Sequence, residues 1–210
     1  MSKANLDYVF INNNINKFKL EINPNTIDVS KYPTKQKLKK NHKELKLIYG
    51  GNLGIPQNPI LISKFISKIE LLENITFKII GSGTEFNFLE KFIKNNNINK
   101  THILSNLPKA TYFSELEKAD LGLIFLNEEF SIPNYPSRLL DYLYFDLAII
   151  SNTDINTDIT DFIKNANVGK CFYGEKDLDN MILEIKKIKE NSIYLESFTQ
   201  NSYISMIKNF

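Results

Sequence analysis

Residues 45–54 read LKLIYGGNLG, an apolar run that ends in a turn rich in glycine. Further short runs of β-forming residues follow it, and segments with apolar residues at helical spacing separate them. Strands that alternate with helices are typical of βαβ units, whose strands lie parallel in one sheet. The runs are Leu45–Tyr49, Ile75–Ile80, His102–Leu104, Leu121–Leu126, Ala148–Ser151 and Gly169–Tyr173. The sequence therefore predicts an α/β fold with a doubly wound parallel sheet of about six strands.

The segments between the runs carry their apolar residues on one helical face, as helices that cover a sheet do. Four of the runs contain continuous apolar stretches, which is typical of strands that are covered on both faces. The expected helices are Ile60–Leu72, Glu85–Asn95, Tyr112–Lys118, Ser137–Phe145, Ile159–Lys164, Lys176–Lys189 and Ser202–Phe210.

The first 43 residues have a different pattern. Tyr8–Ile11 and Lys19–Ile22 look like isolated short strands with no long helix between them, which is too little for an independent domain. Tyr32–Lys43 is polar and rich in lysine, the composition of a connecting segment. We therefore expect residues 1–43 to end in a linker and to pack on something else, and residues 44–210 to form the domain.

The composition is that of a globular protein, with 42% hydrophobic and 24% charged residues among 210. The net charge of +2, from 26 basic and 24 acidic residues, gives no electrostatic argument for a nucleic-acid partner. A single cysteine, Cys171, cannot form an intramolecular disulfide, and no Cys/His cluster has zinc-site spacing. No apolar run approaches the ~20 residues that span a bilayer, and the N-terminus has no apolar signal region. We expect a soluble, cytoplasmic chain.

Two glycine-rich turns follow the first two strands, at the edge where open α/β sheets bind ligands. The turn at residues 50–54 would let backbone amides approach an anion at the start of the next helix. The turn at residues 81–83 precedes Thr84, a candidate N-cap. Tight packing and a capped turn are the structural alternatives. Neither turn is the G-x-G-x-x-G fingerprint of dinucleotide-binding folds, so NAD is not expected.

The stretch PNYPSRLLD at residues 133–141 follows the fourth strand and joins a proline-braced loop to a helix start. A helix N-terminus offers free amides and a positive dipole end to an anion. Ser137 can cap the helix, and Arg138, the only arginine of the chain, is a charged phosphate donor. Asp141, one turn on, can accept two sugar hydroxyls. The alternative is a surface ion pair between Arg138 and Asp141, with Pro136 as an ordinary helix starter.

Four motifs resemble, in order and spacing, those of the group 1 (family 4) glycosyltransferases, which have the two-domain GT-B fold. They are PNTID at residues 24–28, YGGNLG at 49–54, IIGSG at 79–83 and PSRLLDYL at 136–143. The resemblance implies that residues 1–43 are a remnant of the first domain and the crossing segment, with the linker. It also implies that residues 44–210 are the C-terminal, Rossmann-like domain that binds the donor nucleotide sugar.

The resemblance places a nucleoside diphosphate sugar, UDP-linked, across the strand ends, with no metal or other cofactor and no catalytic residue assigned. The residues matched to this site are Gly51, Asn52, Leu53, Gly54, Gln57, Gly83, Leu107, Pro108, Ser137, Arg138 and Asp141. Asp141 takes the place of the ribose-binding acidic residue, and Ser137 and Arg138 match a pair near the diphosphate. The amides of the first glycine turn would approach the phosphates, while Gly83 and the Leu107-Pro108 turn would border the nucleoside.

The sequence departs from the family pattern at three positions. Asn52 and Gln57 stand where many members have Arg and Lys that neutralise the leaving diphosphate, and the first Glu of the Glu-x7-Glu pattern falls on Pro133. Losing one such electrostatic contact can cost ~10²–10³ in rate. We therefore expect the isolated chain to be inactive.

The leading hypothesis is transfer of a sugar from the nucleotide sugar to a surface glycan such as capsule or lipopolysaccharide, with retention of anomeric configuration as in related hexosyltransferases. The acceptor site would come from an acceptor-domain protein or a missing N-terminal half, which would also supply any peripheral contact with the inner face of the membrane. The chain would then be a fragment, a split subunit or a degenerate remnant. The rival hypothesis is a non-catalytic α/β interaction module that binds a partner through residues 8–22. A flavodoxin- or receiver-like domain would need a phosphate loop or an acidic cluster where Gly50 and Gly51 stand.

Overall fold

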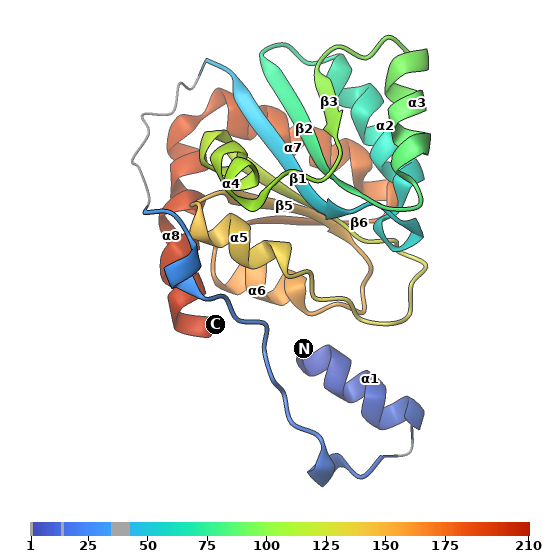
Figure 1. Ribbon diagram of the computed structural model, residues 1–210, viewed down its shortest axis with the longest axis vertical. Coiled ribbons are helices and arrows are strands. Elements are labelled where there is room, and N and C mark those ends of the chain that lie inside the picture. Colours follow the sequence, from blue (N-terminus) through green and yellow to red (C-terminus); the bar gives the residue numbers. More distant parts are fainter. Residues whose placement is uncertain (1, 14, 35–42) are drawn as a thin grey trace.

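A computed structural model describes residues 2–13, 15–34 and 43–210 (Figure 1). At its centre is a six-stranded parallel sheet with the strand order β3-β2-β1-β4-β5-β6. The strands are β1 (Leu45–Asn52), β2 (Ile75–Ser82), β3 (Thr101–Leu104), β4 (Leu121–Phe125), β5 (Ala148–Thr153) and β6 (Gly169–Tyr173). Each overlaps one of the six predicted runs, with bounds that differ by up to three residues, so the predicted α/β class and parallel sheet are confirmed.

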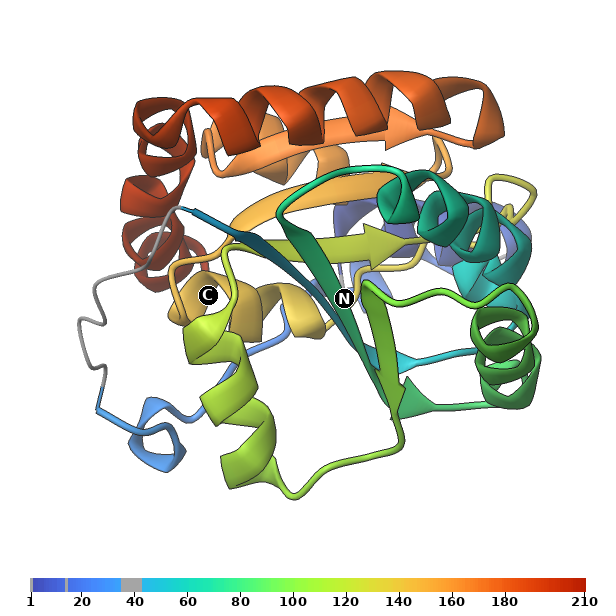
Figure 2. The ribbon, with the colours of Figure 1, turned by 90° about the horizontal axis from the view of Figure 1, so that it is seen from above.

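Helices cover both faces of this sheet. They are α2 (Pro59–Glu70), α3 (Phe86–Asn95), α4 (Lys109–Lys118), α5 (Arg138–Tyr144), α6 (Ile159–Asn165), α7 (Leu178–Glu190) and α8 (Ser192–Asn209). Helices α2, α3 and α7 pack on one face and α4, α5 and α6 on the other, so that the sheet is the middle of three layers (Figure 2). Among the described helices, none is both long enough and apolar enough to cross a membrane.

Two apolar cores, one on each side of the sheet, follow from the alternation of side chains along the strands. On β1, Leu47 and Tyr49 belong to the core under α2 and α7, whereas Ile48 belongs to the core under α4 and α5. Helix α8 links the two cores, because Phe198 packs in the first and Met206 in the second. All five residues of β4 are buried, as expected for a central strand covered by helices on both faces.

The sheet opens at its centre, between β1 and β4. β1 pairs with β2 along its whole length, whereas its pairing with β4 stops at Ile48 and Gly122. Beyond that point the hydroxyl of Tyr142 bridges the gap, because it accepts a hydrogen bond from Gly50 N (2.8 Å) and donates one to Leu123 O (3.3 Å). The strand order reverses between β1 and β4, so this opening is the topological switch point at which doubly wound folds bind ligands.

The N-terminal residues differ from the prediction. α1 (Lys3–Asn13) is helical where Tyr8–Ile11 was expected to be a strand. The strand expected at Lys19–Ile22 is also wrong, because a short 3-10 helix, Lys17–Lys19, leads into residues without regular structure. Strand propensity expresses how well a side chain fits a sheet. All six strands of the described chain belong to the central sheet, and α1 lies apart from it (Figure 1), so hydrogen bonds within a helix satisfy this backbone.

The predicted linker Tyr32–Lys43 falls mostly on residues 35–42, which lie outside the described residues. Its first residue is packed on the domain, contrary to the prediction. The Tyr32 ring stacks on Phe113 of α4, with centroids 4.6 Å apart, and its centroid lies 4.5 Å from that of Tyr144 of α5. The polar composition of the stretch concealed this one aromatic anchor, which buries its ring between two helices.

Candidate functional site

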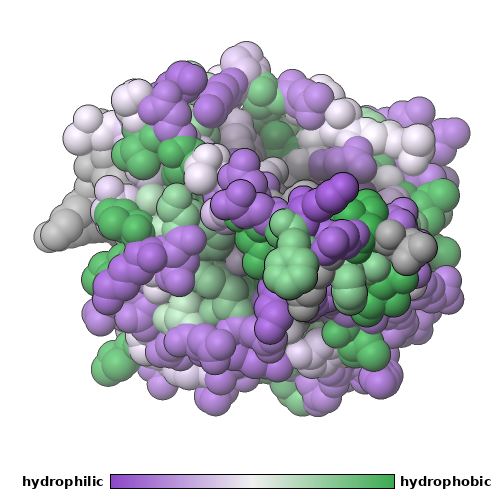
Figure 3. Space-filling view, turned by 90° about the horizontal axis from the view of Figure 1, so that it is seen from below, coloured by the Kyte–Doolittle hydropathy of each residue, from purple (hydrophilic) through white to green (hydrophobic). Residues whose placement is uncertain are grey.

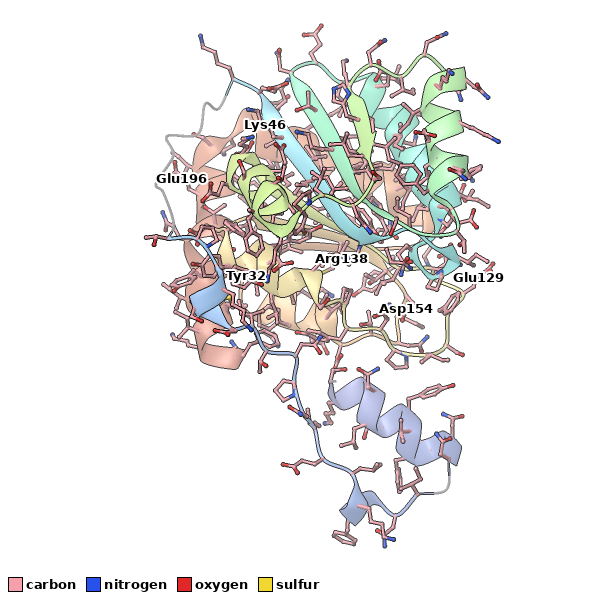
Figure 4. All side chains as sticks on the ribbon, in the orientation of Figure 1. Tyr32, Lys46, Glu129, Arg138, Asp154 and Glu196 are labelled. Atoms are coloured by element: carbon pink, nitrogen blue, oxygen red, sulfur yellow. The ribbon has the colours of Figure 1, made fainter. Side chains whose placement is uncertain are left out.

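A pocket of about 680 Å³ lies at the carboxyl ends of the strands, where β1 and β4 part. The turn after β1, the loop between β3 and α4, and the loop that leads into α5 surround it. Figure 4 labels Arg138 at this edge of the sheet and Tyr32 on the N-terminal segment beside α5. The lining residues are Asn25, Gly50, Gly51, Asn52, Gln57, Ile80, Asn106, Leu107, Lys109, Tyr112, Asn134, Tyr135, Pro136, Ser137, Arg138 and Asp141.

The structure brings most of the sequence-predicted residues together around this pocket. Those that line it are Gly51, Asn52, Gln57, Leu107, Ser137, Arg138 and Asp141. Leu53, Gly54, Gly83 and Pro108 are not among the lining residues. Leu53 is a core residue, 1% exposed, and Pro108 directly precedes α4 as its N-cap residue. Core packing explains the place of Leu53, and the start of α4 explains that of Pro108.

Gly83 serves the close approach of two turns. Its φ of 152° favours glycine, and a Cβ at this position would lie 2.2 Å from the carbonyl oxygen of Leu53. The same carbonyl accepts a hydrogen bond from Glu85 N (2.9 Å) at the start of α3. The turn after β2 is thereby fixed against the turn after β1.

Gln57 closes the glycine turn after β1. Its buried Oε1 accepts hydrogen bonds from Gly54 N (3.0 Å) and from Asn52 Nδ2 (3.0 Å). The two amide side chains that stand in place of the family's basic residues are therefore used to hold the turn together. They bring no positive charge to the pocket.

Arg138 lies over the ring of Tyr49, with its Cζ 4.4 Å from the ring centroid. Its guanidinium also packs on Gly51, where a Cβ would lie 3.0 Å from Nη2. Within the described chain, Nη1 is buried and has no hydrogen-bond partner. A buried donor without a partner is costly, so this nitrogen is available to donate to a group that accepts hydrogen bonds.

The surface ion pair between Arg138 and Asp141, the structural alternative to an anion site, does not form. Among the described residues no salt bridge joins the two side chains, and Asp141 accepts a hydrogen bond from the hydroxyl of Tyr32 instead (2.5 Å). The predicted cap is also wrong, because the exposed Ser137 side chain makes no capping hydrogen bond to α5. Ser137 is instead one of the residues that line the pocket.

Asp141 is half-buried, and burial raises the pKa of its carboxyl above the ordinary value. The hydrogen bond from Tyr32 and the nearby charge of Lys109 act in the opposite direction on this pKa. Burial and the neighbouring carboxylate raise the pKa of the Tyr32 hydroxyl in turn, so Tyr32 is the donor in this pair. Asp141 is thus a hydrogen-bond acceptor at the pocket wall. Tyr32 and Lys109 partly offset the cost of burying its ionised carboxylate.

The loop between β3 and α4 forms the opposite wall. Tyr112 crosses the end of β1 so closely that a Cβ at Gly50 would lie 2.2 Å from its hydroxyl oxygen. Lys109, the first residue of α4, places Nζ 5.0 Å from the ring centroid of Tyr32 and 5.1 Å from that of Phe113. This lysine adds a second positive charge to the pocket lining.

Several lining residues were not among the residues matched to the site from the sequence. They are Asn25, Gly50, Ile80, Asn106, Lys109, Tyr112, Asn134, Tyr135 and Pro136. Asn25 donates a hydrogen bond to the carbonyl of Tyr135 (3.3 Å), a contact between residues far apart in the sequence. No local pattern reveals such a contact. Lys109 and Tyr112 follow a strand and open a helix, and that position is a signal that could have identified them.

The pocket suits an anionic ligand. Its charged lining residues are Arg138 and Lys109 against Asp141, an excess of one positive charge. Among the described residues, no group of three or more His, Cys, Asp or Glu side chains could hold a metal ion.

Pro133, at the position of the family's first Glu, is buried, and its carbonyl accepts a hydrogen bond from Asn5 Nδ2 of α1 (2.5 Å).

The model of the glycosyl transferases group 1 family matches residues 30–204. The chain belongs to the group 1 glycosyltransferases. The matched region of this glycosyltransferase chain begins before the sheet, so it includes Tyr32, whose hydroxyl bonds to Asp141 in the pocket. A search of curated proteins finds no match to the sequence.

Solved glycosyltransferases share the fold of this group 1 chain. A variant of S. aureus TarM, in complex with fondaparinux, α-GlcNAc-glycerol and UDP, is 13% identical with a TM-score of 0.76, covering 100% of this chain and 40% of TarM. WaaG, a glycosyltransferase involved in lipopolysaccharide biosynthesis, is 16% identical with a TM-score of 0.61, covering 80% of this chain and 44% of WaaG. At these identities the likeness shows the fold alone.

The structure of a separate C-terminal domain shows how much of a group 1 glycosyltransferase this chain corresponds to. The C-terminal domain of LpcC, a group 1 glycosyltransferase of Francisella tularensis, is 13% identical with a TM-score of 0.67. The alignment covers 88% of the present glycosyltransferase chain and 98% of that domain. The chain thus spans less than half the length of WaaG and TarM, and nearly all of a separate C-terminal domain.

Proposed function

We propose that this chain is the donor-binding half of a glycosyltransferase that transfers a sugar from a nucleoside diphosphate sugar, UDP-linked, to a surface glycan such as capsule or lipopolysaccharide. The observation that carries the proposal is the convergence of Arg138, Gly51 and Asp141 on one pocket at the switch point of the sheet. Family membership supports the transferase class.

The pocket offers a suitable place for each part of the donor. The diphosphate would lie against the guanidinium of Arg138, whose buried Nη1 has no partner within the described chain, and against the exposed backbone of Gly51. A ribose hydroxyl would donate to Asp141, and the base would lie toward Leu107. The volume of about 680 Å³ falls within the range of small-molecule sites. The UDP present in the TarM complex supports this assignment.

The acceptor half would come from another part of a longer protein or from a separate chain. The side on which it would pack is that of α1: Asn5 of α1 contacts Pro133 in the loop beside the pocket, and apolar side chains of α1 and of the residues that follow it are exposed. Phe18 is 99% exposed and Ile11 is 75% exposed. Figure 3 shows apolar atoms among polar ones on the face from which α1 projects. An acceptor domain that packs there would cover these side chains and close over the donor.

Calorimetric titration of the purified chain with UDP, GDP and UDP-sugars tests donor binding directly. We expect UDP and UDP-sugars to bind and turnover to be undetectable, because Asn52 and Gln57 are engaged in the turn and Pro133 offers no carboxylate. A chain that ignores all of these nucleotides at millimolar concentration would favour the non-catalytic interaction module. Detectable hydrolysis or transfer by the chain alone would overturn the assignment of the acceptor site to a second half.

A further inference from the structure

The N-terminal segment reaches the pocket although it precedes the first strand. We propose that Tyr32 is a positioning residue for nucleotide binding: its hydroxyl holds one carboxylate oxygen of Asp141 and leaves the other oxygen facing the pocket for a ligand hydroxyl. This inference rests on the proposed function, because the ligand hydroxyl is that of a bound nucleotide.

The direction from which Tyr32 approaches supports positioning over blocking. Asp141 lines the main pocket, whereas Tyr32 does not. Tyr32 instead borders a separate depression between the N-terminal segment and α4, together with Lys109 and Phe113. The hydroxyl of Tyr32 therefore reaches Oδ1 of Asp141 from behind. Within the described chain, the other oxygen, Oδ2, makes no hydrogen bond.

The Tyr32 ring is fixed on several sides. It stacks on Phe113, with an angle of 26° between the ring planes, and it contacts Tyr144 at a steeper angle of 48°. The Tyr144 hydroxyl donates to the carbonyl of Pro33 (2.9 Å) rather than to Asp141. A donor held this way orients the carboxylate before a ligand arrives, so less side-chain freedom is lost on binding.

The charge of Asp141 depends on the same contact. The titratable groups that face Asp141 are Tyr32 from the N-terminal segment, Lys109 and Tyr112 from α4, and Tyr142 within α5. Burial raises the pKa of Asp141, and the hydrogen bond from Tyr32 lowers it in part. Removing the hydroxyl therefore raises the pKa of Asp141 further. As the pH falls, the carboxylate that accepts a ribose hydroxyl is then protonated at a higher pH than in the wild type.

The matched variants Tyr32→Phe and Tyr144→Phe separate positioning from packing. Each removes one hydroxyl from the same aromatic cluster and keeps the ring, but only Tyr32 bonds to Asp141, whereas Tyr144 bonds to Pro33. The first readout is the carboxyl ¹³C shift of Asp141 against pH without ligand. We expect its midpoint to rise in Tyr32→Phe and to stay at the wild-type value in Tyr144→Phe. An unchanged midpoint in Tyr32→Phe would show that the Tyr32 hydroxyl does not hold the Asp141 carboxylate.

The second readout is calorimetric affinity for UDP and for 2′,3′-dideoxy-UDP, which lacks the ribose hydroxyls. Tyr32→Phe should bind UDP about three- to tenfold more weakly, as for the loss of one hydrogen bond, and bind the dideoxy compound like the wild type. Tighter UDP binding would show that Tyr32 blocks the pocket, and equal losses in both variants would show a packing effect. If the wild type binds no UDP, the proposed function fails, while the titration still decides whether Tyr32 holds Asp141.

Discussion

The guanidinium of Arg138 lies over the ring of Tyr49, the last apolar residue of the predicted first strand, with Cζ 4.4 Å from the ring centroid. The ring belongs to the core on the far side of the sheet, so it gives the charged group a rigid support. This cation–π contact holds the guanidinium in place and leaves Nη1 without a partner in the described chain. The only arginine of the chain is thereby held at the opening between β1 and β4.

Arg138→Ala should weaken UDP binding by about 1.5–3 kcal/mol, because a hydrogen bond to a charged group is lost. Binding of uridine, which has no phosphate, should change little. Arg138→Lys keeps the charge but not the planar fork, so it should recover only part of the affinity. Calorimetry of both ligands measures these effects, with Lys68→Ala as the control, since this cation of α2 is paired with Asp179 and does not line the pocket. Equal losses for UDP and uridine would place Arg138 away from the diphosphate.

The sheet could be predicted from the sequence because each strand carries its own local evidence. The runs that became β1, β2 and β4 are apolar, short and followed by turn residues, and the helices between them show one apolar face. Local periodicity also located Arg138 and Asp141, since both stand at the start of a helix that follows a strand. Strand ends of a parallel sheet meet at one edge, so residues from separate motifs could be assigned to one pocket.

The contacts that the sequence did not reveal join distant residues. Tyr32 stands in a polar stretch, and its bond to Asp141 depends on how the N-terminal segment folds back over α4 and α5. The role of Gln57 was also hidden, because its position matched a basic residue that contacts the donor, whereas its amide closes the turn. α1 was misassigned because apolar and aromatic residues at 8–11 favour a strand only where a sheet edge is available.

Tyr142→Phe should destabilise the fold by about 1–3 kcal/mol. Its hydroxyl is buried at the split between β1 and β4, and without it the buried N–H of Gly50 has no acceptor. For a chain of this size, 1 kcal/mol corresponds to a change in Tm of about 2–4 °C. Thermal unfolding measures the loss, with Tyr173→Phe, whose hydroxyl meets Lys164 on the surface, as the control. Identical Tm values for the two variants would show that the bridge adds no stability.

Asp141→Asn should stabilise the ligand-free chain at neutral pH while it weakens nucleotide binding. Because burial raises the folded-state pKa of Asp141, the folded chain binds more protons than the unfolded chain between the ordinary and the raised pKa. The contribution of Asp141 to stability is therefore present at pH values below its unfolded pKa and is lost as pH rises through its folded pKa. Asparagine keeps an oxygen for the Tyr32 hydroxyl and cannot ionise.

We expect the Tm of Asp141→Asn to exceed that of the wild type at pH 7 and the difference to shrink toward pH 4. Thermal unfolding across this range measures it, and Asp161→Asn, at an exposed position of α6, is the control. A variant that is less stable than the wild type at neutral pH would show that the ionised carboxylate supports the fold.

The exposed apolar side chains near α1 should make the isolated chain self-associate. Phe18 is 99% exposed and Ile11 is 75% exposed, and covering one such side chain contributes about 1.5–3 kcal/mol. Replacing both with serine should therefore raise the dissociation constant for self-association at least tenfold, with UDP affinity unchanged because neither residue lines the pocket. Leu71→Ser is the matched control, since Leu71 is 82% exposed at the end of α2. Sedimentation equilibrium over a range of concentrations measures the constant. A wild-type chain that is monomeric throughout, or a Leu71→Ser variant that dissociates as readily as the double variant, would remove the case for an interface at α1.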